Sequence, residues 1–123
     1  MSHIVTIKTE VRDAVAIGAA CTRLGLSQPE FGTRRLFNAS AAGFAVQLPG
    51  WHYPVVCDTA AGIIHYDNYN GAWGKQCELD RFLQAYAVER TKLEARKRGH
   101  AVTEQSLADG SIKLCVQLAG GAA

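Results

Sequence analysis

The chain has 123 residues, of which 48% are hydrophobic and 20% are charged, a composition typical of one globular domain of ordinary size. Its formal charge of +2 is too small to indicate a nucleic-acid or acidic-membrane partner. No apolar run approaches the roughly 18 residues of a membrane span, and no charged segment followed by an apolar one opens the chain. We therefore expect a cytoplasmic protein with no membrane or nucleic-acid partner, consisting of a single domain over residues 1–118 and a flexible Ala/Gly tail at 119–123.

The N-terminal part predicts a strand followed by a helix. Residues 2–11 alternate apolar and polar side chains, which favours a half-buried strand. Asp13 can cap a helix that runs to about Leu24, and Gly25 can close it in a left-handed conformation. Cys21 falls on the apolar face of this helix, so we expect its thiol in the core.

Three further strands are expected in the middle of the chain, at residues 31–38, 44–48 and 52–58. Pro54 lies within the last of them and indicates an edge position or a bulge, because proline donates no hydrogen bond to the ladder. A brief pairing is expected at 63–66.

The stretch from Gln76 to Arg98 predicts one long amphipathic helix. Basic residues crowd its last turn, where cations interact favourably with the helix dipole, and Gly99 offers the residue that ends it. We interpret the basic cluster as a solvated helix face. The apolar positions recur at three- and four-residue spacing: Leu79, Phe82, Leu83, Tyr86 and Leu93.

A hairpin is predicted to follow, with strands at 100–107 and 111–118 around an Asp-Gly turn. The element order is then β-α-β-β-β-α-β-β. This order predicts an α+β fold with a mostly antiparallel sheet of five to six strands and both helices packed on one face.

Several short motifs resemble a family of small uncharacterised proteins encoded in cyanobacteria, in red-algal plastid genomes and in scattered other bacteria. The motifs are Met1-Ser2-His3, Thr6-Ile7-Lys8-Thr9, Arg81-Phe82-Leu83, Tyr86-Ala87, Asp109-Gly110-Ser111-Ile112-Lys113-Leu114 and Val116-Gln117. The similarity covers nearly the whole chain and is strongest at its two ends. Pro54, Cys57 and Leu118-Ala119 depart from the family pattern. The resemblance implies a single domain of unknown function. It also suggests an AAA-type ATPase or a ferredoxin-like iron–sulfur protein as a partner, because relatives are encoded near such proteins.

The cysteines and histidines do not have the spacing of a metal site. The four cysteines contain no C-x-x-C pair, which fits reduced thiols. His52 and Cys57 are the one loosely paired set, and strand geometry would place them on opposite faces. We therefore predict no metal and no cofactor.

Two sets of residues could support chemistry. Cys77 lies near the start of the long helix, where the helix dipole favours a thiolate. Asp58, His65 and Asp67 could form an acid/base set on a polar loop. A small redox or catalytic module that uses either set is the alternative function.

Aromatic residues beside the turns between positions 51 and 73 are the more suggestive feature. Exposed aromatics often anchor a protein partner, although these rings could also cover the sheet. Because the common nucleotide, hydrolase and zinc-protease motifs are absent from the sequence, we expect a protein-binding or adaptor module and lean against an enzyme. The sequence leaves the oligomeric state open, a homo-oligomer included. The expected partner-binding residues are Trp51, Tyr66, Tyr69 and Trp73.

Overall fold

The computed structural model describes residues 5–8, 10–36 and 39–118, so the tail predicted at 119–123 lies outside the described residues. The chain divides into two compact units, Met1–Tyr86 and Ala87–Ala123. A single domain over 1–118 stays a prediction. Among the described residues, no helix combines the length and the apolar character that crossing a membrane would require.

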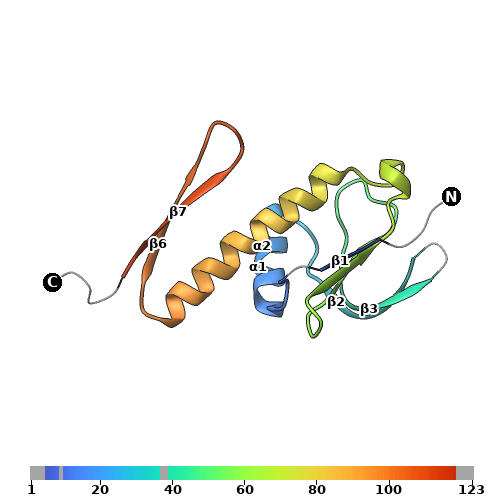
Figure 1. Ribbon diagram of the computed structural model, residues 1–123, viewed down its shortest axis with the longest axis horizontal. Helices are drawn as coiled ribbons and strands as arrows, with labels where there is room; N and C mark the ends of the chain where they lie inside the picture. Colours follow the sequence, from blue (N-terminus) through green and yellow to red (C-terminus); the bar gives the residue numbers. More distant parts are fainter. Residues whose placement is uncertain (1–4, 9, 37–38, 119–123) are drawn as a thin grey trace. The chain divides into compact units, whose positions relative to one another are not determined.

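A five-stranded antiparallel sheet forms the centre of the first unit (Figure 1). Its strands stand in the order β1-β5-β4-β3-β2, so β1 and β2 are its edges. The α+β class and the antiparallel pairing are confirmed. The strand bounds are β1 Val5–Lys8, β2 Glu30–Arg35, β3 Ser40–Val46, β4 Val55–Asp58 and β5 Ile63–Tyr66.

The element order follows the predicted one with one addition, β5. This strand, expected only as a brief pairing, lies between β1 and β4 inside the sheet. Its position follows from the tight connection after β4, where the Asp58 side chain accepts a hydrogen bond from Ala61 N at 3.2 Å and Gly62 N donates to Asp58 O at 2.8 Å. Pro54 precedes β4 instead of interrupting it, so the ladder loses no donor.

Helix α1 (Ala14–Leu24) has the ends that the sequence predicts. The Asp13 side chain accepts hydrogen bonds from Val15 N at 2.9 Å and Ala16 N at 3.2 Å, and Gly25 closes the helix in a left-handed conformation with φ 71°. The predicted core position of Cys21 is confirmed, since its side chain is buried.

Helix α2 (Gln76–Lys97) begins in the first unit, where its residues Leu79, Phe82, Ala85 and Tyr86 are buried. Cys21 of α1 lies near enough to Cys57, and Asp80 of α2 near enough to Tyr66, to raise the pKa of the residue that each faces. Cys57 and Tyr66 lie on the same face of the sheet, because Cys57 stands opposite Ile64, two residues before Tyr66. Both helices therefore lie on one face of this sheet.

The second unit consists of the rest of α2 and a hairpin, β6 (Ala101–Ser106) and β7 (Ile112–Gln117). Gly99, with φ 74°, ends the helix as predicted, and His100 N donates to Ala95 O at 2.8 Å. Lys92 of α2 forms an ion pair with Glu104 of β6 at 3.0 Å. The predicted hairpin is confirmed, but among the described strands β6 and β7 pair only with each other, as a separate two-stranded sheet.

Candidate functional site

The aromatic-rich loop between β5 and α2 is a compact hydrogen-bonded structure. It contains one short 3-10 turn, η1 (Tyr69–Gly71). Asn68 is its organising residue: its carbonyl accepts from Gly71 N at 3.0 Å and from Trp73 N at 2.9 Å, and its side-chain amide donates to Gly74 O at 3.2 Å. His52 N donates to Trp73 O at 2.7 Å, which ties this loop to the one before β4. The backbone therefore fixes where the aromatic rings point.

Three rings gather around that of Trp73, and we call His52, Tyr53, Tyr69 and Trp73 the aromatic cluster. The Tyr69 ring stacks on Trp73 with centroids 4.7 Å apart and an angle of 26°. The His52 and Tyr53 rings lie 5.4 Å and 5.7 Å from the Trp73 ring, and 4.7 Å from each other. Tyr69 is 39% exposed, His52 is exposed, and Tyr53 and Trp73 are half-buried. The cluster thus presents ring surface to solvent.

Trp51 and Tyr66 do not belong to this surface. They are 5% and 6% exposed and pack edge-on with centroids 5.5 Å apart. The indole N–H of Trp51 donates to Lys75 O at 3.1 Å. Gly74 lies against the Trp51 ring so closely that a Cβ there would run into it. Burial, and secondarily the charge of Asp80, raises the pKa of Tyr66. Of the four aromatic residues expected to bind a partner, the structure leaves Tyr69 and Trp73 accessible.

Asp67 is fully buried at the start of this loop. Its Oδ1 accepts from Tyr69 N at 3.2 Å, while its Oδ2 has no hydrogen-bond partner among the described residues. The residue that donates this hydrogen bond, Tyr69, has a positive φ of 48°. A non-glycine residue in that region of φ is held there only when its surroundings require it. Asp67 therefore helps to set the orientation of the exposed Tyr69 ring.

The acid/base set suggested by the sequence is not gathered in one place. Asp58 stands opposite Ile63 at one end of β5, and His65 stands opposite Val56. Asp67 directly follows the other end of β5. At the rise per residue of an extended strand, it lies about 13 Å from Ile63. The Asp58 carboxylate bonds the turn after β4, and that of Asp67 bonds its own loop. Each acid has a local role in the backbone.

The thiols fall into two pairs. Cys21 and Cys57 are buried, and Cys77 and Cys115 are exposed. Burial raises the pKa of Cys21, and burial together with the nearby Cys21 raises the pKa of Cys57 to about 12, so these two are inert at neutral pH. Cys77 is the second residue of α2, as the sequence predicts. Within the described residues, no group of three or more His, Cys, Asp or Glu side chains could hold a metal ion.

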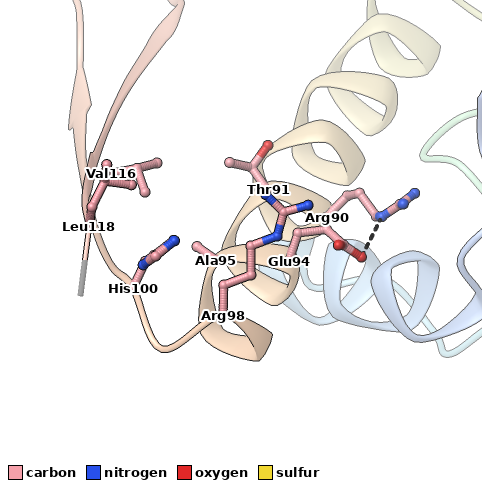
Figure 2. A pocket seen from close by; sticks show the side chains of 8 residues that line it. All are labelled: Arg90, Thr91, Glu94, Ala95, Arg98, His100, Val116 and Leu118. Carbon is pink, nitrogen blue, oxygen red and sulfur yellow. Dashed lines mark ion pairs between the residues drawn. The ribbon is translucent and has the colours of Figure 1, made fainter. Parts of the chain in front are cut away.

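Two open pockets accompany these features. One, of about 420 Å³, adjoins the aromatic loop. It is lined by Pro49, Gly50, Gly71, Ala72, Gly74, Lys75 and Glu78. The other, of about 370 Å³, lies within the second unit, and Figure 2 shows the side chains that line it. There the Arg90–Glu94 ion pair of 3.5 Å and Arg98 lie opposite Val116 and Leu118 of the hairpin.

Sequence reasoning missed both the role of His52 and Tyr53 and the second pocket. The run Trp51-His52-Tyr53 held a signal, since three consecutive rings cannot all point into one core. Comparison of the chain with models of known protein families, with curated proteins and with solved structures found no match. The functional argument therefore depends on the geometry of the chain itself.

Proposed function

We propose that the chain is a small cytoplasmic protein-binding module that recognises its partner through the aromatic cluster. The observation that carries the proposal is the stacked pair of Tyr69 and Trp73, accessible to solvent on a loop fixed by hydrogen bonds. Tyrosine and tryptophan are the residues most enriched at the centres of protein interfaces. Rings already held in place lose little conformational entropy on binding.

Binding has more support than catalysis in this chain. The carboxylates of Asp58 and Asp67 stand near opposite ends of β5 and engage their own turns. A general acid/base pair must instead converge on one reacting group. Cys77 is exposed at the start of α2, but a reactive thiol also needs a base or cation to activate it, and the structure provides no observation that favours one.

For the partner, we propose the classes that the family resemblance suggests, an AAA-type ATPase or a ferredoxin-like iron–sulfur protein. The resemblance is the source of this part of the proposal. The cluster itself specifies only a partner surface with an apolar, ring-accepting pocket bordered by polar groups.

The test is a binding measurement with purified partner candidates from the source organism, under anaerobic conditions and with and without ATP. We expect Tyr69→Ala and Trp73→Leu each to weaken binding about tenfold or more, as hot-spot aromatics do. Val15→Ala is the control, because Val15 is a large apolar residue 68% exposed on α1 and belongs to neither the cluster nor β2.

The proposal fails if a partner binds the Tyr69 and Trp73 variants as tightly as it binds the unmodified protein. Failure of both candidate classes to bind would reject the partner assignment. In that case, capture of partners by the unmodified protein but not by the Tyr69→Ala variant would still test the aromatic cluster as a binding surface.

A further inference from the structure

Strand β2 ends the five-stranded sheet, and among the described strands it has a neighbour only on the β3 side. Leu36 N donates to Ala39 O at 2.7 Å, which continues the β2–β3 ladder. Backbone groups in an antiparallel ladder point alternately toward and away from the neighbour. The N–H and C=O groups of Phe31, Thr33 and Arg35 therefore point outward from the sheet. A further strand could bond them once Arg34 Nη1, which donates to Thr33 O at 3.3 Å, moves aside.

Two of the three charged side chains of β2 are placed symmetrically around Gly32. Glu30 and Arg34 lie on one face, each two residues from Gly32, and form an ion pair of 3.8 Å along the strand. Their side chains are 80% and 34% exposed. On the other face Phe31 is 72% exposed and packs edge-on against Phe44 at 4.9 Å. A strand with opposite charges equidistant from a central glycine is complementary to a second copy of itself.

We propose that β2 pairs antiparallel with β2 of a second copy of this chain, about a two-fold axis at Gly32. In this register Glu30 of each copy stands directly opposite Arg34 of the other. Phe31 stands opposite Thr33 on the other face. The two sheets would become one continuous sheet, joined by about four backbone hydrogen bonds from the outward-pointing groups.

The geometry favours this register over its neighbours. The Glu30–Arg34 positions would be the closely spaced, non-hydrogen-bonded pairs, where opposite charges across strands attract most effectively. Gly32 carries no side chain at the axis, where the two copies approach each other. Sliding the strands by two residues, the smallest shift that keeps the same groups facing each other, would place Glu30 opposite Leu36 or Gly32 and lose both ion pairs. Pro29, which has no N–H, marks the natural end of the pairing.

Charge reversal gives a direct test by sedimentation equilibrium and native mass spectrometry of the full chain. We expect the unmodified protein to form a dimer whose dissociation constant rises with salt. The single variants Glu30→Arg and Arg34→Glu should each raise that dissociation constant about tenfold or more, because like charges would then face each other. An equimolar mixture of the two single variants should form a heterodimer, and the double variant Glu30→Arg/Arg34→Glu should dimerise again.

Arg35→Glu is the matched control, since it makes the same charge change on the opposite face of the same strand. It should leave the dissociation constant within about twofold of the original. Thermal melting of every variant checks that the fold is intact. The Glu30 side chain is exposed, so its substitution should leave the fold unchanged. A monomeric unmodified protein at all accessible concentrations would overturn the proposal, and so would single variants that dimerise as well as it does. A monomer that instead captures another protein's strand at β2 would also reject the second copy as the occupant.

Discussion

At the scale of single residues, Tyr86 joins helix α2 to the segment that leads into α1. Its hydroxyl accepts hydrogen bonds from Arg12 N and Asp13 N, both at 3.1 Å, and donates to Glu10 O at 3.3 Å. Tyr86 is 6% exposed, and these three bonds are partly buried. One hydroxyl thus satisfies backbone groups more than seventy residues away in sequence.

We predict that Tyr86→Phe lowers the free energy of unfolding by about 1–3 kcal/mol, because it removes three part-buried hydrogen bonds to the backbone. Urea denaturation followed by circular dichroism measures the change. Tyr69→Phe is the control, because Tyr69 is exposed. Removal of its hydroxyl should lower the free energy of unfolding by about 0.5 kcal/mol or less. Equal stabilities for Tyr86→Phe and the unmodified protein would mean that water replaces the lost hydroxyl.

Sequence reasoning identified residues whose role is local and missed those whose role depends on the fold. The Asp13 cap, the Gly25 end and the buried Cys21 follow from spacing within one helix, and all three are confirmed. The hydroxyl bonds of Tyr86 could not be predicted, since the helical period says only that its ring faces inward. For the same reason the sequence could not separate the buried Trp51 from the accessible Trp73.

At the scale of elements, the β6–β7 hairpin depends on the short turn between its strands. Asp109 Oδ1 accepts hydrogen bonds from Ser111 N at 3.0 Å and from Ser111 Oγ at 2.6 Å, and Gly110 occupies a left-handed conformation with φ 90°. Leu107 N donates to Ser111 O at 2.9 Å, which closes the loop. The Ser111 side-chain and backbone hydrogen bonds lower the pKa of Asp109.

This lowered pKa predicts that the turn loosens in acid. A carboxyl whose folded pKa lies below its unfolded value of about 3.9 stabilises the fold above that value, and this stabilisation is lost as the pH falls through the folded pKa. We expect the carboxyl carbon of Asp109 to titrate by NMR below its usual range. Ser111→Ala should move the midpoint upward, and Lys113→Ala, in the adjacent strand, should leave it in place. A midpoint that Ser111→Ala does not move would exclude these bonds as the cause.

The elements themselves were largely predictable, because each has a local signal in the sequence. The capped helix α1, the long helix α2 ended by Gly99, and the Asp-Gly hairpin were all expected and are observed. Two features depend on pairing between segments and were not evident. One is the inner position of β5, a strand of only four residues. The other is the separation of β6 and β7 into their own sheet, since alternation predicts a strand but not its neighbour.

At the scale of the whole molecule, the two sheets differ in how well their backbones are protected. Strands β4 and β5 each have a neighbour on both sides, and their residues Val56, Cys57 and Ile64 are fully buried. Within the described part of the chain, strands β6 and β7 pair only with each other, and most of their residues are exposed. A two-stranded ribbon is marginally stable in water by itself.

We therefore predict uneven hydrogen exchange along the chain. Bonded amides of β4 and β5 should exchange about 100-fold or more slowly than those of β6 and β7, after correction for intrinsic rates. Hydrogen exchange followed by NMR measures this difference. At two pH values, the exchange rates should change in proportion to the hydroxide concentration. Similar protection in both sheets would show that the hairpin opens only when the whole chain unfolds.

The unequal burial of the two tryptophans has a spectroscopic consequence. Trp51 is enclosed, with its indole N–H bonded to Lys75 O, whereas Trp73 lies half-buried in a cluster that reaches solvent. The fluorescence of Trp51 should peak at a shorter wavelength than that of Trp73. Acrylamide should quench the fluorescence of Trp73 more strongly than that of Trp51. Since these are the only two tryptophans in the sequence, the Trp51→Phe protein would carry a single intrinsic fluorophore at the aromatic cluster. Its emission would report occupation of that surface without any added label.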